Sequence, residues 1–271
     1  MVQAHPFHLV TVSPWPFIVS CSAFTAALGF VFLMHLDNYS SNSYLSHIGL
    51  ILLHLGIFSL GLALYRWFTD IVTEATFEGH HTLKVQQGLR YGVVLFIFSE
   101  IMFFFGFFWA FFHSSLSPAV SIGCIWPPKG VEVIKPFELP FLNTLILLSS
   151  GVSITWAHRA IFAGNRQDTI IALAVTVLLG IIFTGCQAFE YYTAPFSIND
   201  GIYGSIFYMT TGFHGFHVLV GTIFLVTNLW RQIQYHFTRQ HHFGFEAGAW
   251  YWHFVDVVWI FLFISLYWWG S

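Results

Sequence analysis

Charged residues are scarce in this chain: Asp, Glu, Lys and Arg together make up 8% of its 271 residues, and the formal net charge is −3. A soluble domain needs more polar surface than this to cover an apolar interior. A nucleic-acid-binding protein needs a basic patch, and the sequence has no cluster of Lys and Arg. The scarcity of charge excludes both classes and indicates that the solvent of this protein is a lipid bilayer.

Cysteine and the common catalytic motifs are also lacking. The three cysteines, Cys21, Cys124 and Cys186, do not have the spacing of a metal site or a redox motif, and they provide no disulfide framework. Glycine-rich phosphate loops, nucleophile elbows and paired catalytic carboxylates are missing. We therefore expect no catalytic centre in the isolated chain. Whether the chain belongs to an enzyme is left open by these residues.

Long apolar runs are what the chain has in abundance, with 56% hydrophobic residues and 33 phenylalanines. A membrane-spanning helix needs about 20 apolar residues. Seven runs qualify, near residues 15–36, 46–68, 89–112, 139–158, 169–192, 202–230 and 248–269. Their continuity favours helices over barrel strands. The sequence thus predicts an all-α integral membrane protein with seven transmembrane helices, divided into a two-helix unit (1–70) and a five-helix bundle (71–271).

The distribution of basic residues predicts the orientation of these helices. If the N-terminus lies inside, seven basic residues fall on the inner side and two on the outer side, and positive charge is enriched in inner loops. The inner residues are Arg66, Lys84, Arg90, Arg159, Arg166, Arg231 and Arg239, and the outer residues are Lys129 and Lys135. An odd number of spans then places the C-terminus outside. The connection over 113–138 is expected to form a proline-stiffened outer cover.

One carboxylate interrupts the third apolar run. Glu100 lies within Tyr91 to Phe112, and the side chains one helical turn away on either side are apolar. Burying a charge at this depth costs about 3 kcal/mol on insertion scales, so the carboxyl needs a partner from another helix. We expect His214 or His217 of the sixth run to be that partner, and we expect Glu100 to be neutral. The alternative is a purely structural acid satisfied by any neighbouring helix.

The chain contains 15 histidines, and their spacing indicates whether they could bind a metal. A membrane di-iron enzyme would show several histidine boxes, whereas this chain offers HxxH at His214 and His217 and two HH pairs. Axial haem ligation by His54, His158 or His253 is left open by the sequence. We favour hydrogen-bonding roles for these histidines and expect no metal site.

Polar residues near the span ends favour lipid contacts. Residues 67–82, WFTDIVTEATFEGHHT, place Trp67 and then Glu74 and a histidine pair at the membrane edge. The guanidinium of Arg231 matches the oxygens of a phosphate, although ordinary snorkelling explains its position equally well. In the last run, His253 and Asp256 are three residues apart, so they share a helix face, and we expect a structural polar pair whose members satisfy one another or a neighbouring helix.

Several long stretches resemble one family, subunit 3 of the haem-copper cytochrome c oxidases in its mitochondrial form. They are SPWP (13–16), EATFEGHHT (74–82), LFIFSEIMFF (95–104), FFWAFFHSSLSP (107–118), WPPKG (126–130), LLSSGVSITWAH (147–158), INDG (198–201), YGSIFYMTTGFHGFH (203–217) and HHFGFEAGAWYWHFVDVVW (241–259). They occur in the family's order and reach across the chain. Glu100 occupies the family's intramembrane carboxylate, and Trp67, His81 and Arg231 match positions linked to bound lipid.

The resemblance implies a non-catalytic core subunit of respiratory complex IV in the mitochondrial inner membrane, with the N-terminus on the matrix side and the C-terminus on the intermembrane side. It implies a V-shaped, lipid-filled cleft between the first two helices and the other five. The chain would bind structural phospholipids but no metal, while haem and copper would lie in partner subunits. It would stabilise subunit 1 and support proton uptake and oxygen access during the reduction of dioxygen to water.

The partners implied are subunit 1 as the main contact, subunit 2, accessory subunits, cytochrome c at the level of the complex, and respiratory supercomplexes, with no nucleic acid. The competing interpretation is an independent histidine-rich membrane redox enzyme or transporter. Such a protein would purify alone and carry its own haem or iron.

Overall fold

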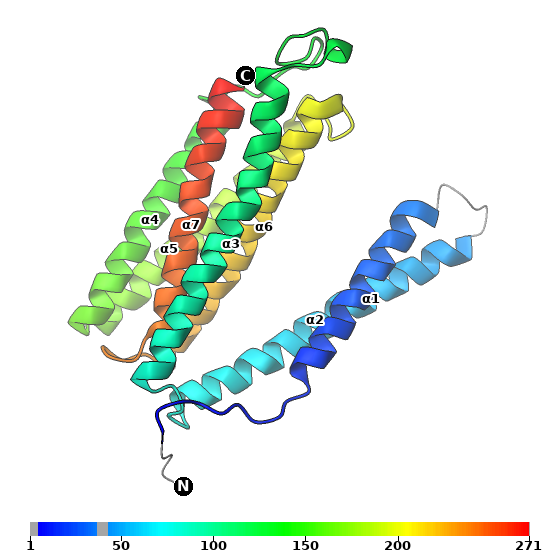
Figure 1. The fold of residues 1–271 in the computed structure, drawn as a ribbon. Coiled ribbons are helices and arrows are strands. Elements are labelled where there is room, and N and C mark those ends of the chain that lie inside the picture. Colours follow the sequence, from blue (N-terminus) through cyan, green and yellow to red (C-terminus); the bar gives the residue numbers. More distant parts are fainter. Residues whose placement is uncertain (1–4, 37–42, 271) are drawn as a thin grey trace. The chain divides into compact units, whose positions relative to one another are not determined.

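The computed structural model describes residues 5–36 and 43–270, and these residues fold into helices without any strand. The long helices are α1 (Trp15–Leu36), α2 (Ser43–Thr76), α3 (Leu83–Leu116), α4 (Leu139–Ala163), α5 (Arg166–Thr193), α6 (Gly201–Ile233) and α7 (Phe243–Leu262) (Figure 1). A π-helical segment, η2 (Phe263–Trp269), extends α7. Each of the seven is long and apolar enough to cross a bilayer. This confirms the predicted all-α architecture with seven membrane helices.

The chain divides into two compact units, Met1–Gly88 and Leu89–Ser271. The sequence interpretation placed this boundary after residue 70, which lies inside α2, because that helix continues to Thr76. Most helices extend beyond the apolar runs that predict them. Backbone hydrogen bonding does not stop where hydropathy falls, so a polar turn at the membrane edge stays helical.

In the first unit, α1 and α2 pack with their backbones in close contact. A Cβ atom added at Gly29 would overlap the backbone of Leu53, and one added at Gly56 would overlap Ala26. Small residues at such positions let two membrane helices approach closely enough for extensive van der Waals contact. At the other end of the pair, Trp15 Nε1 donates a hydrogen bond to Asp70 Oδ2 (2.5 Å).

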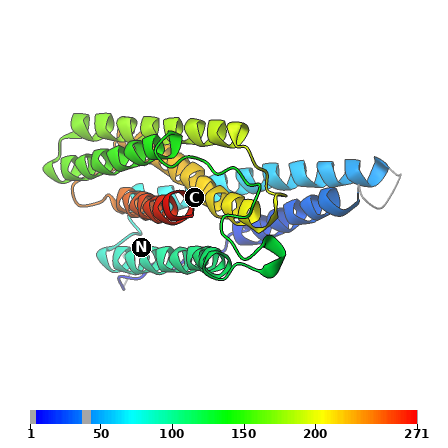
Figure 2. The same ribbon diagram turned by 90° about the horizontal axis from the view of Figure 1, so that it is seen from above.

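In the second unit, α7 is the central helix, and the other four surround it (Figures 1 and 2). Two of its tryptophans, Trp252 and Trp259, are fully buried and make polar contacts with α4. Trp252 Nε1 donates to Ser150 Oγ (2.8 Å), and Trp259 Nε1 donates to Thr144 Oγ1 (3.0 Å). Because lipid cannot satisfy these indole N–H groups, hydrogen bonds between helices fix how α7 is rotated against α4.

The helix α3 packs on α6 and α7 through large aromatic side chains. Phe104 lies against Phe254 of α7, with ring centroids 6.1 Å apart, and Phe103 lies against Phe213 of α6, at 5.0 Å. After α3, the connection over 117–138 folds back on this unit, where the ring of Trp126 packs edge to face against that of Phe111, with centroids 5.9 Å apart. The side chain contacts position the polar residues of α3 next to α6.

We predict that Gly56→Ala lowers the free energy of unfolding of the first unit by about 1 to 3 kcal/mol, because the added methyl group forces α1 and α2 apart. Gly61→Ala, in the same helix, is the matched control, since a Cβ atom there would meet nothing within 4 Å. Helix propensity alone makes the control neutral or stabilising. Thermal unfolding of both variants in detergent measures the difference, and equal unfolding temperatures would refute the close α1–α2 contact.

Candidate functional site

The intramembrane carboxyl of Glu100 on α3 meets an imidazole of α6. His217 Nε2 lies 2.8 Å from Glu100 Oε2, and the exposed fractions of the two side chains are 9% and 22%. Five aromatic rings surround this imidazole, with centroid separations of 5.1 to 6.3 Å, and they belong to Phe103, Phe104, Phe216, Tyr251 and Phe254. The pair is therefore held in an apolar setting, where a hydrogen bond is stronger than in water.

The hydrogen bonds of His217 fix where protons can sit. Its Nδ1 lies 2.6 Å from the carbonyl oxygen of Phe213, and a carbonyl oxygen only accepts, so Nδ1 carries a hydrogen. Nε2 can then either accept from a protonated Glu100 or, as part of an imidazolium, donate to a carboxylate. Both forms have zero net charge. The arrangement therefore places an ionisable pair at mid-membrane without placing net charge there.

The other expected partner, His214, lies elsewhere. Its Nε2 is 3.2 Å from the carbonyl oxygen of Val255, and its ring lies 5.2 Å from that of Trp259. His214 and His217 are three residues apart on one helix, yet His214 faces α7 and His217 faces α3. Spacing alone could not distinguish them.

The residues expected to bind lipid lie in both units. In the first unit, Trp67 is half-buried on α2, while Glu74 and His81 lie at the end of this helix and in the turn after it. His8 lies next to them: one ring nitrogen of His8, one of His81 and one carboxylate oxygen of Glu74 lie within 4.8 Å of one another. In the second unit, Arg231 lies in the last turn of α6.

The Arg231 guanidinium lies 4.4 Å above the ring of Phe237, and its Nε is buried without a hydrogen-bond partner in the described part of the chain. Next to it, burial lowers the pKa of His236, and the Arg231 charge lowers it further. Of these two neighbours, Arg231 therefore carries the positive charge and His236 does not.

The expected polar pair on α7 shares a helix face, but the two side chains make no hydrogen bond to each other in the described residues. His253 Nε2 is 3.4 Å from Thr155 Oγ1 of α4. Asp256 packs its carboxyl over Gly151, where an added Cβ would lie 2.6 Å from Oδ2. Each side chain is directed toward α4 rather than toward its neighbour on α7.

A second buried carboxyl was missed by the sequence interpretation. Glu190 Oε1 on α5 accepts hydrogen bonds from Tyr267 Oη (2.6 Å) and from Gln187 Nε2 (3.1 Å). All three side chains are buried. Glu190 is the acid within the apolar fifth run, but the polar residues Gln187 and Thr193 lie one helical turn from it. The apolar neighbours that singled out Glu100 are therefore lacking here.

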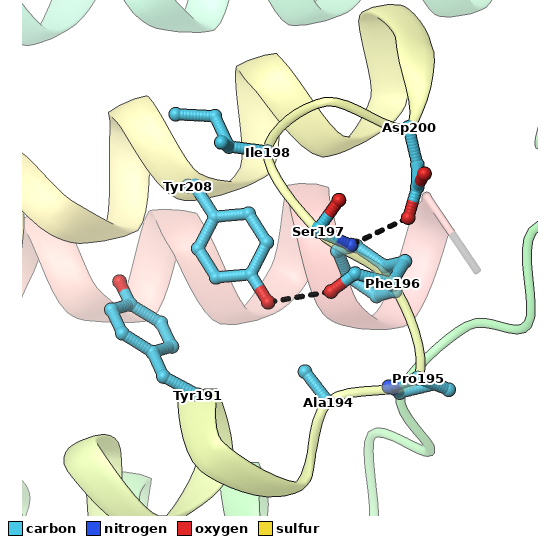
Figure 3. A pocket seen from close by; sticks show the side chains of 8 residues that line it. All are labelled: Tyr191, Ala194, Pro195, Phe196, Ser197, Ile198, Asp200 and Tyr208. Carbon is cyan, nitrogen blue, oxygen red and sulfur yellow. Dashed lines mark hydrogen bonds between the residues drawn. The ribbon is translucent and has the colours of Figure 1, made fainter.

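A shallow pocket of about 590 Å³ lies at the connection from α5 to α6 (Figure 3). Its polar groups are used locally: Tyr208 Oη donates to the carbonyl oxygen of Phe196 (2.7 Å), and Ser197 N donates to Asp200 Oδ2 (2.6 Å). Tyr191 donates to Thr211 on α6 (2.7 Å). These bonds close the turn, and they leave the Glu100–His217 pair as the stronger candidate site.

Comparison with known proteins identifies the family. A model of the cytochrome c oxidase subunit III family matches residues 5–271. The protein named cytochrome c oxidase subunit 3 of Prototheca wickerhamii is 59% identical over 270 residues, covering 100% of both chains. The chain belongs to the cytochrome c oxidase subunit III family.

Other members of the family are similar over the same length. The subunit 3 of Chondrus crispus is 58% identical, with 100% of this chain and 96% of that protein covered, and that of Scyliorhinus canicula is 54% identical, with 99% of both covered. The family match includes both units and contains Glu100 and His217.

We predict that Glu100→Gln is nearly neutral and that Glu100→Ala destabilises the second unit by about 1 to 3 kcal/mol. The amide keeps a donor for His217 Nε2, whereas alanine leaves this nitrogen buried and unpaired. Ser99→Ala is the control, because among the described residues Ser99 bonds within its own helix, to the carbonyl oxygen of Phe96 (2.6 Å). Thermal unfolding of the purified variants measures the effect, and equal losses in the Gln and Ala variants would reject the hydrogen-bond account.

Infrared spectroscopy can establish where the shared proton sits. We expect a protonated carboxyl band that disappears in Glu100→Gln, because desolvating two charges costs more than burying a neutral acid and a neutral imidazole. A carboxylate band at neutral pH that depends on Glu100 would establish the imidazolium form instead.

Proposed function

We propose that this chain is a non-catalytic core subunit of cytochrome c oxidase in the mitochondrial inner membrane. Full-length similarity to proteins named cytochrome c oxidase subunit 3 carries the proposal. In this role it contacts the catalytic subunit 1 and stabilises it, together with subunit 2 and accessory subunits. The haems and copper reside in the partner subunits, and cytochrome c docks on the assembled complex.

The surface of the second unit supports assembly with other membrane proteins and lipid. Large apolar side chains are exposed along its helices, among them Phe105, Val152, Leu178, Phe216 and Phe261. The two histidines of the HxxH motif, which were candidate metal ligands, both make hydrogen bonds within the protein: His214 to a backbone carbonyl and His217 to Glu100. Those bonds favour a structural role over an axial ligand role. This argues against a metal centre built on the HxxH pair.

The charge pattern supports the proposed orientation. In the second unit, five arginines lie at the end where α3 begins, α4 meets α5, and α6 meets α7, namely Arg90, Arg159, Arg166, Arg231 and Arg239. Lys129 and Lys135 lie in the connection at the opposite end. Applied to an inner membrane, the positive-inside rule assigns the arginine end to the matrix. The N-terminus is proposed to share that side and the C-terminus to face the intermembrane space.

Purification of the tagged chain in mild detergent tests the proposal. We expect it to purify with partner subunits that carry haem and copper, in fixed ratio to the chain. A chain that runs alone, with its own stoichiometric haem or iron, would overturn the subunit assignment and favour the independent redox enzyme.

Binding of phospholipid is the second part of the proposal. Arg231 supports it, because its guanidinium is half-buried at the span end and no carboxylate of the described residues forms an ion pair with it. An unpaired guanidinium at this depth suits a lipid phosphate, which accepts two parallel hydrogen bonds. Trp67, Glu74 and His81 are proposed to line the lipid contacts of the first unit. Roles in proton uptake and oxygen access rest on the family resemblance.

We expect Arg231→Ala to lower the number of phospholipids retained by the purified complex while leaving its assembly intact. Arg166→Ala is the matched control, since the Arg166 guanidinium is used within the chain, on the carbonyl oxygen of Ile233 (2.8 Å) and over the ring of Tyr235 (3.8 Å). Native mass spectrometry counts the lipids. Unchanged lipid occupancy in Arg231→Ala would show that this arginine only snorkels to the interface.

A further inference from the structure

Three metal-ligating side chains meet at the arginine-rich end of the second unit. His158 lies in α4, His242 directly precedes α7, and Glu246 lies in the first turn of α7. One ligand atom from each lies within 4.8 Å of the other two. His242 and Glu246 are buried, with exposed fractions of 4% and 8%, and His158 is half-buried. Neither the proposed subunit role nor the Glu100–His217 pair uses this cluster.

The hydrogen bonding of His242 leaves its Nε2 without a hydrogen and with its lone pair directed into the cluster. Its Nδ1 lies 2.9 Å from the carbonyl oxygen of Thr238, so Nδ1 must carry the hydrogen. The lone pair of Nε2 then faces Glu246 Oε1 at 3.4 Å. Two acceptors that face each other in a buried position repel, unless a proton or a cation lies between them.

A second imidazole nitrogen and a fixed carboxylate complete the arrangement. His158 Nε2 is buried without a hydrogen-bond partner among the described residues, and the rings of Phe162 and Phe245 hold its imidazole at 5.0 and 5.5 Å. Arg90 Nε donates to Glu246 Oε2 (2.8 Å), which leaves Oε1 free to bind. Metal-binding residues are commonly oriented in this way by outer hydrogen bonds from their other polar atoms.

We propose that His158, His242 and Glu246 form a binding site for a zinc ion. Zn–N and Zn–O bonds of about 2.0 to 2.1 Å in a tetrahedron separate the ligand atoms by about 3.3 Å. The His242 Nε2 to Glu246 Oε1 distance of 3.4 Å already has this value. The ligand atom of His158 lies within 4.8 Å of the other two and moves closer when zinc binds, and water takes the fourth position. Two imidazoles and one carboxylate select zinc over the oxygen-preferring magnesium and calcium ions.

Zinc counting on the purified complex tests the site. The complex is stripped with a chelator and dialysed against buffered Zn²⁺, and bound zinc is counted per copy of this chain, with peptide mass spectrometry giving the amount of chain. We expect His242→Gln and Glu246→Gln each to hold one zinc ion fewer than the unsubstituted complex. His241→Gln, one residue along on the exposed side of the connection, is the control and should match the unsubstituted complex. Equal zinc counts in all four would overturn the proposal and leave a shared proton in the cluster.

A measurement on the unsubstituted complex keeps the proposal testable if the variants fail to assemble. The X-ray absorption spectrum of the zinc lost on chelation and restored by dialysis should show two imidazoles and oxygen ligands. A spectrum without imidazole would reject the site. Zinc binding should also weaken as the pH falls, because the imidazoles must be neutral to bind, and an affinity that does not change on acidification would contradict the assignment.

Discussion

A polar side chain inside a span gains its hydrogen bonds from the protein, because the hydrocarbon around it offers none. That requirement determines how the helices of the second unit meet. Trp252 and Trp259 donate to Ser150 and Thr144 of α4, and Ser153 of α4 lies 2.7 Å from Thr176 of α5. Hydrophobic attraction between membrane helices is weak, so these bonds and close packing set the rotation of each helix.

The central helix α7 shows how packing and polar contacts act together. Trp252 fits against two glycines, where an added Cβ would lie 2.8 Å from its ring at Gly180 and 3.0 Å from it at Gly221. The indole can therefore reach Ser150 only because α5 and α6 leave this space. With α7 fixed, Phe254 and Tyr251 form part of the aromatic surround of His217, which in turn positions the nitrogen that meets Glu100.

The sequence predicts most of the architecture, because span-length apolar runs and a charge within them are local signals. It predicts less about which side chains contact one another across different helices. Glu100 stood out by its apolar neighbours, and His217 was one of two named partners, yet the choice depends on how α6 is rotated. The ion pair of Arg90 and Glu246 joins residues 156 positions apart, so no spacing could reveal it. Helical spacing left open whether His253 and Asp256 satisfy one another or a neighbouring helix, and both side chains face α4, His253 at Thr155 and Asp256 over Gly151.

Two histidines of the second unit are oriented by the same local hydrogen bond, but their Nε2 atoms have different roles. His217 and His242 each donate from Nδ1 to the carbonyl oxygen four residues earlier, and each thereby presents Nε2 to a glutamate, Glu100 at 2.8 Å and Glu246 at 3.4 Å. At mid-membrane no hydrated cation can arrive, so a proton is what joins the first pair. At the span end water is near and a second imidazole is present. The wider separation there leaves room for a metal ion where the first pair has room for a proton alone.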